Sequence, residues 1–190
     1  GFENALMTTG SPLDSTAQTI TFSLAKNCRI LLEAMARLLA LCNQLARLQR
    51  KVYLDFTNCL QTLGYLNRIG FFDHLHDAVV VLPRRPSLSS ALAFDGNNHG
   101  VVELRSIDPK KQDPNIPRLL KKSFAECAGE QYSRRAFTVF SEFFDNVYEH
   151  SKAEIAGFAA LQFYRRGNHL QAVISDSRIG IVGTLLPVLA

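Results

Sequence analysis

Apolar and polar residues alternate along several short segments of the chain and recur with helical spacing along longer ones. Alternation is typical of half-buried strands, and it predicts strands over residues 20–24 and 101–107. Between residues 28 and 50, apolar positions return every three or four residues, which predicts a long amphipathic helix. The same spacing predicts another long helix over residues 133–151. The chain is therefore expected to have an α/β fold.

Further apolar segments complete two groups of elements. In the first group, residues 51–56 and 78–82 are predicted strands that follow the first long helix. In the second group, a shorter helix over residues 118–128 precedes the second long helix. Strands over residues 156–164 and 170–175 follow it, joined by a turn at residues 165–168.

The composition changes at two places along the chain. Residues 1–17 are polar and rich in Ser, Thr and Gly, which predicts a flexible lead-in. Residues 108–117 hold three prolines among charged residues, a composition typical of a linker. We therefore expect one α/β unit over residues 18–107 and a second over residues 118–190.

The overall composition is that of a globular protein that can bury a core. Of the 190 residues, 47% are hydrophobic and 20% are charged, and the formal net charge is +4. Basic doublets lie in five different predicted elements or loops: Arg84–Arg85, Lys110–Lys111, Lys121–Lys122, Arg134–Arg135 and Arg165–Arg166. Because nucleic-acid binding proteins gather such charges on one face, this scatter favours solvated surface, and no nucleic-acid partner is expected.

Neither a disulfide framework nor a membrane segment is predicted. The chain has four widely spaced cysteines, without a Cys-x-x-Cys pair: Cys28, Cys42, Cys59 and Cys127. Reduced, buried thiols in a cytoplasmic protein are the expectation. His74 and His76 have no third ligand at a suitable spacing, so a metal site is not expected there. The longest apolar stretches contain charged or amide residues, so no membrane association is expected.

The most informative chemistry lies in the second unit. Glu142, Asn146 and His150 are four residues apart, so on a helix their side chains project from one face. About thirty residues later, a predicted strand ends at Asp176, and Gly180 follows within a turn. A carboxylate, an amide and an imidazole beside an acidic turn can hold a metal-bound triphosphate and a purine.

A purely structural interpretation of the same stripe stays open. Any amphipathic helix has a solvated face, and in this interpretation four apolar residues of the helix face the core: Phe143, Phe144, Val147 and Tyr148. The acidic turn after the strand favours the nucleotide interpretation, because it adds an independent feature in the same order along the chain.

This order of residues resembles the N box and the G1 box of the GHKL ATPases, a superfamily that includes histidine kinases and DNA gyrases. The Asn-x-x-x-His-Ser ending is most similar to the branch of anti-sigma-factor serine kinases. The resemblance covers roughly residues 130–190 and implies part of a GHKL-type α/β sandwich. It also implies ATP and Mg²⁺ as ligands.

The resemblance implies a role for each residue of the pattern. Asn146 would supply an oxygen to Mg²⁺, and Glu142 would be the general base toward water or an acceptor hydroxyl. His150 would face a phosphate. Asp176 would accept a hydrogen bond from the exocyclic amine of adenine, and Gly180 would let the backbone pass close to the base.

Two departures from the family pattern affect this site. Arg178 stands where the family turn has its first glycine, so it either obstructs the base or reaches a phosphate. The glycine-rich lid of the family has no counterpart in residues 181–190.

The first unit carries a weaker resemblance. Residues 51–58, an apolar strand that ends in Asp, Phe, Thr and Asn, are similar to a segment of STAS domains. The serine acceptor pattern of those domains is absent, since Thr57, Asn58 and Cys59 occupy the turn. A STAS-like unit next to a kinase-like unit implies a regulatory role.

Two functions are therefore considered. The first is a bacterial regulatory ATPase or serine kinase of the histidine-kinase-like type, with ATP and a protein as partners. The alternative is a non-catalytic sensor or interaction module with a degenerate nucleotide site. A homodimer is an open alternative for either function.

Overall fold

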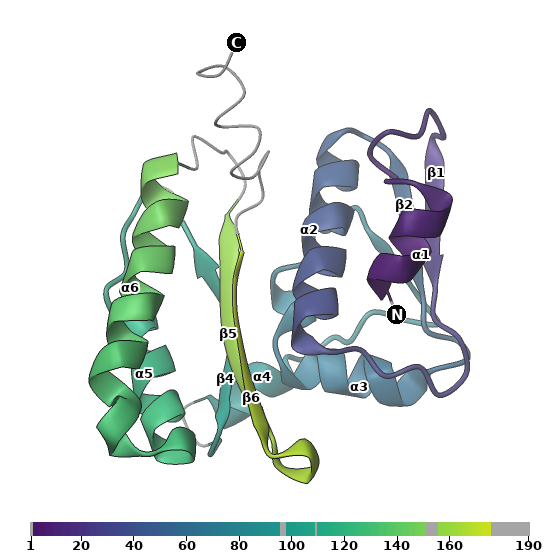
Figure 1. The fold of residues 1–190 in the computed structure, drawn as a ribbon. Helices are drawn as coiled ribbons and strands as arrows, with labels where there is room; N and C mark the ends of the chain where they lie inside the picture. The colour runs from purple at the N-terminus through teal and green to yellow at the C-terminus, as the bar shows by residue number, and fades with distance from the viewer. Residues whose placement is uncertain (1, 96–97, 109, 151–155, 176–190) are drawn as a thin grey trace. The chain divides into compact units, whose positions relative to one another are not determined.

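The computed structural model of the chain describes residues 2–95, 98–108, 110–150 and 156–175. The chain forms two compact units that divide between Phe94 and Asp95, as Figure 1 shows. We call them unit 1 and unit 2. Each unit contains one three-stranded sheet together with helices, so the α/β class predicted from the sequence is confirmed.

Unit 1 is built on a parallel sheet. Its strands β1 (Thr19–Ser23), β2 (Lys51–Asp55) and β3 (Val80–Leu82) lie in sequence order, and each neighbouring pair is parallel. Parallel neighbours require a crossover connection, which is usually helical. The helix α2 (Leu32–Arg47) connects β1 to β2, and α3 (Leu60–Arg68) lies between β2 and β3.

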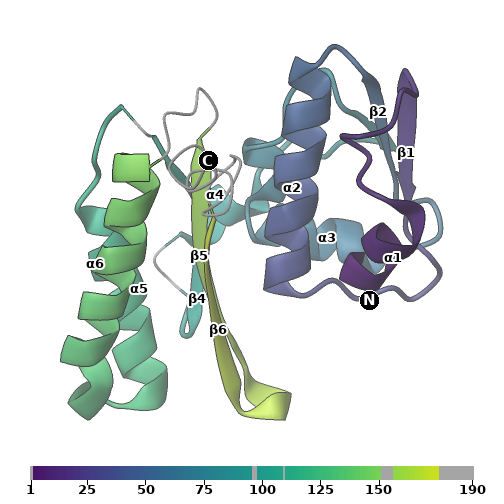
Figure 2. The ribbon, with the colours of Figure 1, turned by 45° about the horizontal axis from the view of Figure 1, so that its top comes forward.

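The core of unit 1 is formed largely by α2, which Figure 2 shows alongside the strands of this unit. The helix is rich in Leu and Ala, has no Gly or Pro, and buries most of its residues, among them Leu32, Met35, Leu38, Leu39, Leu41, Cys42 and Leu45. It begins later than predicted, because residues 25–28 form a turn in which Asn27 has a φ of 59°. The buried rings of Phe71 and Phe72 pack edge to face, with ring centres 5.3 Å apart.

The predicted flexible lead-in is partly helical. Residues 2–9 form the helix α1 (Phe2–Thr9), although none of its side chains is buried. The segment that follows is held by Arg50, whose guanidinium donates hydrogen bonds to the carbonyl oxygens of Pro12 and Leu13 at 2.8 and 3.3 Å. Unit 1 also contains two shorter helices, η1 (Phe71–Asp73) and α4 (Ser90–Phe94).

Unit 2 is built on an antiparallel sheet. Its strands are β4 (Val101–Ile107), β5 (Gly157–Tyr164) and β6 (His169–Ser175), with β5 in the middle. The helices α5 (Asn115–Ala128) and α6 (Ser133–His150) lie side by side against one face of this sheet (Figures 1 and 2).

The division between the units lies earlier than the linker expected at residues 108–117. Strand β4 pairs with β5, and Val102 lies opposite Leu161, so residues 101–107 belong to unit 2 rather than to unit 1. Helix α5 also begins within the expected linker, with Pro117 in its first turn, where a missing N–H costs little. The proline-rich composition therefore marks a helix start inside unit 2.

The core of unit 2 lies between the two helices and the sheet. Its buried residues are Val102, Ile107, Ile116, Leu120, Ala136, Phe140, Phe144, Val147, Ala159 and Leu161. Edge-to-face contacts join Phe124 to Phe140 at 6.0 Å and Phe144 to Tyr148 at 5.1 Å. Gly129, with a φ of 108°, ends α5, and the short helix η2 (Glu130–Tyr132) leads into α6. The left-handed conformation at Gly129 favours glycine and lets the two helices fold back on each other.

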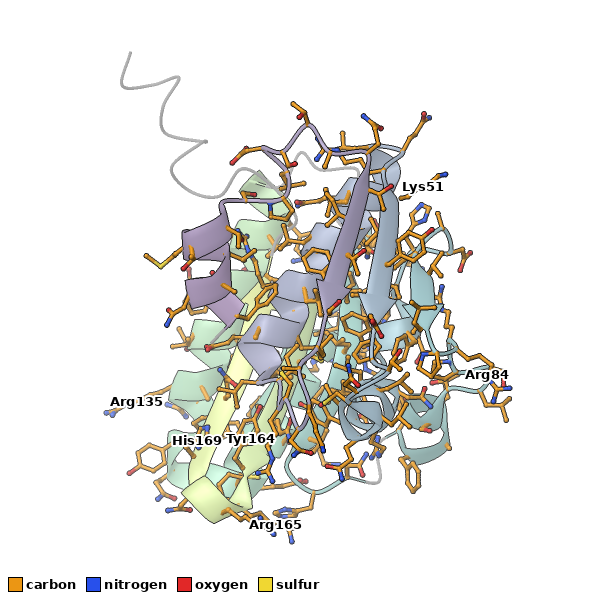
Figure 3. All side chains as sticks on the ribbon, turned by 90° about the vertical axis from the view of Figure 1, so that its right-hand side faces the viewer. Lys51, Arg84, Arg135, Tyr164, Arg165 and His169 are labelled. Carbon is orange, nitrogen blue, oxygen red and sulfur yellow. The ribbon has the colours of Figure 1, made fainter. Side chains whose placement is uncertain are left out.

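The hairpin of β5 and β6 closes as the sequence predicts. It turns through η3 (Arg165–Gly167) and Asn168, whose φ of 46° is in the left-handed region that asparagine tolerates. The ring of Tyr164 stacks on His169 across the end of the hairpin, with ring centres 4.6 Å apart (Figure 3).

Candidate functional site

Helix α6 carries the predicted stripe on its exposed side. Glu142 and Asn146 are both exposed and lie one turn apart, while Phe144 and Val147 point into the core. The predicted helix and the projection of Glu142 and Asn146 away from the core are thus confirmed. His150 is the last residue of α6, and the structure does not describe its side chain.

Hydrogen bonds fix the part of α6 that carries Asn146. The hydroxyl of Tyr148 accepts a hydrogen bond from the backbone N–H of Asp113 at 3.3 Å and donates one to the carbonyl oxygen of Lys111 at 3.4 Å. The carboxylate of Asp145 accepts a hydrogen bond from the amide of Gln112 at 3.0 Å. The loop between β4 and α5 therefore holds the C-terminal half of α6 in place.

The surroundings of Tyr148 are acidic. Burial raises the pKa of its hydroxyl above the ordinary value for tyrosine, and the charges of Asp113, Asp108 and Asp145 raise this pKa further. The backbone hydrogen bond from Asp113 opposes the rise. Three carboxylates near the C-terminal half of α6 favour a cation there over a bare anion.

The end of β6 meets α6 at Gly157, the first residue of β5. A Cβ atom added to Gly157 would collide with the carbonyl oxygen of Ser175 and would lie 3.2 Å from a methyl carbon of Val147. Ser175, the last residue of β6, also donates a side-chain hydrogen bond to the carbonyl oxygen of Phe158 at 3.4 Å. This junction requires glycine at position 157, because three segments approach one another too closely for a side chain.

The junction relates the stripe to the acidic turn. Val147 directly follows Asn146, and Asp176 directly follows Ser175 in the sequence. Ser175, the last described residue before the predicted turn, therefore lies near the helix that carries Asn146. Asp176 and Gly180 themselves, like Arg178, lie outside the described residues.

We expect Gly157→Ala to lower the free energy of unfolding by about 1–3 kcal/mol, the usual cost of forcing extra carbon into a packed site. Gly64→Ala is the matched control. Gly64 lies inside α3 with nothing within 4 Å of an added Cβ atom. Alanine there should stabilise the chain by about 0.4–1 kcal/mol. Urea denaturation measures both changes. Equal stability of Gly157→Ala and the parent chain would show that β6 does not approach α6 this closely.

The buried side-chain amide of Asn43 holds the loop of unit 1 that contains His74 and His76. Asn43 is 7% exposed; its amide donates to the carbonyl oxygen of His74 at 2.9 Å and accepts from the backbone N–H of His76 at 2.8 Å. A lone polar residue on the apolar face of α2 is the signal that could have indicated this contact. Asn43 therefore has a structural role, and it fixes the loop that carries both histidines.

The end of β2 is ordered by local hydrogen bonds. Asp55 accepts a hydrogen bond from the backbone N–H of Thr57 at 2.9 Å, and the side-chain hydrogen bond with Thr57 holds the pKa of this carboxyl below its ordinary value. The thiol of Cys59 donates to the carbonyl oxygen of Cys28 at 3.0 Å. These contacts shape the turn after the strand.

No group of three or more His, Cys, Asp or Glu side chains in the described part of the chain is arranged to hold a metal ion. Within the described ranges, no helix combines the length and the apolar character needed to cross a membrane.

Comparison of the chain with protein-family models found no match, and comparisons with curated proteins and with solved structures found no significant match. A functional assignment therefore depends on the residues and on the arrangement of unit 2.

Proposed function

We propose that unit 2 binds Mg-ATP in the manner of the histidine-kinase-like ATPases, and that the protein is a regulatory ATPase or serine kinase of the bacterial cytoplasm. One observation carries the proposal. Val147, which follows Asn146 on α6, is close to Gly157, and Gly157 is close to the carbonyl oxygen of Ser175, the residue before Asp176 in the sequence. The helix that carries Asn146 and the strand that precedes the acidic turn in the sequence therefore approach each other in unit 2.

The order of elements supports this proposal. Glu142 and Asn146 lie on a helix that packs against a sheet, and an antiparallel hairpin leads from that helix to the acidic turn. The resemblance to the N box and the G1 box depends on this same order. An exposed stripe on an isolated surface helix would not have a strand end beside it.

Exposure of Asn146 suits a magnesium site that is completed by the nucleotide. Mg²⁺ usually takes only one or two ligands from the protein and the rest from phosphates and water. The amide oxygen of Asn146 supplies one such ligand in the proposed complex. Glu142, one helical turn or roughly 5.4 Å earlier, then acts as general base beside the phosphates.

The remaining residues of the pattern complete the proposed site. His150, at the end of α6, faces a phosphate and adds positive charge when it is protonated. Asp176 accepts a hydrogen bond from the exocyclic amine of adenine, and Gly180 leaves space for the base. Guanine has no donor at that position, so the site distinguishes ATP from GTP.

Calorimetric titration of the whole chain with ATP and GTP, with Mg²⁺ or with EDTA, tests the proposal. We expect ATP to bind with Mg²⁺, and GTP to bind at least roughly tenfold more weakly. Asn146→Ala should weaken binding of Mg-ATP by a similar factor and remove its dependence on Mg²⁺. Thr138→Ala, an exposed position on the same helix, should leave it unchanged. Failure of the parent chain to bind ATP would exclude the site.

The second candidate function is a sensor that binds ATP without turnover. Arg178 stands in place of the first glycine of the family turn and favours this alternative. A large side chain at this position would obstruct the adenine base in the proposed site. Unit 1 serves in either case as a STAS-like unit through which a protein partner is contacted. Its parallel sheet with α2 and α3 supports that assignment.

A further inference from the structure

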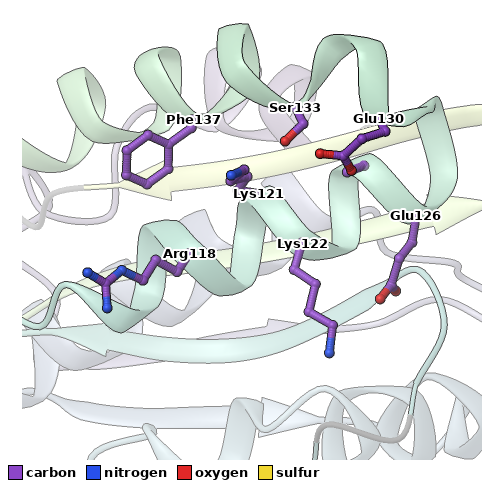
Figure 4. Close-up of a pocket in the computed structure, with 8 residues that line it drawn as sticks. Arg118, Lys121, Lys122, Glu126, Glu130, Ser133 and Phe137 are labelled. Carbon is purple, nitrogen blue, oxygen red and sulfur yellow. The ribbon is translucent and has the colours of Figure 1, made fainter.

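A groove lies between α5 and the first half of α6, on a side of unit 2 that the proposed nucleotide site does not use. Two adjoining hollows of about 590 and 560 Å³ form it, and Figure 4 shows the first of them. Its basic side chains are Arg118, Lys121, Lys122, Arg134 and Arg135. We call it the α5–α6 groove.

The α5–α6 groove holds most of the excess positive charge of the protein. Its five basic side chains face two acidic ones, Glu126 and Glu130, which leaves a net charge of +3. The whole chain, with 21 basic and 17 acidic residues, carries +4. Among the residues that the structure describes, none of the five basic side chains of the groove forms an ion pair. Their charges are thus available to a partner.

The tertiary structure changes the interpretation of the basic doublets. Lys121–Lys122 and Arg134–Arg135 are separate in sequence and were expected to be scattered solvated charge. The reversal of the chain at Gly129 brings both doublets to one groove, because α5 and α6 pack side by side. Figure 4 shows Arg118, Lys121 and Lys122 on one helix and Phe137 on the other, with Lys121 toward the second helix and Arg118 and Lys122 extending away from it.

An aromatic ring adds an apolar contact to the α5–α6 groove. Phe137 is 37% exposed, and the ammonium of Lys121 lies 5.7 Å from its ring centre. The hydroxyl-bearing residue Ser133 lines both hollows one turn earlier on α6. A partner that fills this groove therefore meets positive charge along the rim and an aromatic surface between the helices.

We propose that the α5–α6 groove docks an acidic amphipathic segment of a protein partner. Carboxylates of that segment pair with the five basic side chains, and an apolar side chain packs on Phe137. Exposed ion pairs contribute little individually, so the affinity comes from several of them together and falls with salt.

The composition of the groove disfavours the other polyanions. Single-stranded nucleic acids are bound by several stacking aromatic rings along a basic track. Among the residues lining the two hollows, Phe137 is the one aromatic side chain. Glu126 and Glu130 would also repel the regularly spaced phosphates of a nucleic acid or an anionic membrane. A protein segment can place a basic or polar residue opposite these two carboxylates.

This surface is independent of the proposed nucleotide site. Phe137 and Glu142 are five residues apart on α6, which places their side chains about 140° apart around the helix axis. Arg134 lies nearer the face of Glu142 but two turns earlier, about 12 Å along the helix. Loss of ATP binding would leave this proposal standing, and loss of peptide binding would leave the nucleotide site standing.

The test uses the whole chain and a fluorescein-labelled helical peptide of about five turns, with glutamate on one face and leucine on the other. Fluorescence anisotropy should show micromolar binding that weakens roughly tenfold between about 0.05 and 0.5 M NaCl. Lys122→Glu combined with Arg134→Glu should weaken binding by at least roughly tenfold. Both positions are exposed, so the variant should fold.

The matched control combines Lys51→Glu with Arg84→Glu, two exposed basic residues of unit 1 labelled in Figure 3, and should bind like the parent chain. If the first variant does not fold, Arg118→Ala with Lys121→Ala replaces it. The proposal is overturned if the control loses as much affinity, or if the chain does not bind the peptide. It is also overturned if a single-stranded oligonucleotide or phosphatidylserine vesicles bind the groove more tightly than the peptide.

Discussion

Glu142→Gln is expected to lower ATP turnover by roughly 10²- to 10⁴-fold, the range that a general base contributes. The glutamine amide has nearly the shape of the carboxylate but cannot take a proton from water or from a hydroxyl. Glu142 is exposed on α6, so its replacement should leave the packing of the helix intact. Because Asn146 is the proposed ligand of the metal, the affinity for Mg-ATP should change by no more than about twofold. Phosphate release at saturating ATP and calorimetric binding measure the two effects separately.

Thr138→Ala is the control for this prediction. Thr138 is exposed one turn before Glu142, and its hydroxyl donates only to the carbonyl oxygen of Arg134, at 3.3 Å. Its replacement should leave turnover unchanged. Unaltered turnover in Glu142→Gln would exclude Glu142 as the base. Binding of Mg-ATP by the parent chain without turnover would instead establish the sensor alternative.

Phe144→Ala is expected to lower the free energy of unfolding by about 3–5 kcal/mol, the usual loss for a fully buried phenylalanine. Phe144 is 1% exposed and belongs to the core between the helices and the sheet of unit 2. It also packs edge to face on Tyr148, which ties the end of α6 to the loop before α5. The variant should therefore also weaken binding of Mg-ATP, because Asn146 lies on the same turn of the helix.

Phe143→Ala is the matched control, since the same substitution is made one position earlier. Contrary to the expectation from the sequence, Phe143 is 55% exposed and does not face the core. Its loss should therefore change the unfolding free energy by no more than about 0.5 kcal/mol. Urea denaturation followed by circular dichroism compares the two variants directly. Similar losses in both would mean that α6 does not face the sheet with the side that carries Phe144.

Local pattern was enough to predict the regular elements. Strand β4 has the predicted bounds, Val101–Ile107, although an irregularity between Val102 and Arg105 interrupts the alternation and leaves Glu103 buried. Helix α6 begins at the predicted Ser133, and its exposed stripe follows from the same 3.6-residue period. Both inferences need only the residues within one element, which is why they succeed without a structure.

Contacts between distant segments were not predictable in the same way. The sequence does not show that β4 pairs with β5, about fifty residues later, and so the expected linker was placed after β4 instead of before it. The sequence of helix α1 also lacks a pattern of buried apolar positions that would predict a helix, since none of its residues is buried. Burial patterns are informative only where an element packs against a core.

The sequence alone determined the class of the fold, the long helices, most strands and the spacing of Glu142 and Asn146 on one helical face. These properties depend on the periodicity of side chains along a helix or a strand, which can be read from the residues of one segment alone. Only the tertiary structure decided where the units divide and why position 157 must be glycine. It alone gathered two basic doublets into the α5–α6 groove. Such features arise from contacts between segments far apart in the chain, and side-chain periodicity within one segment does not encode its partner.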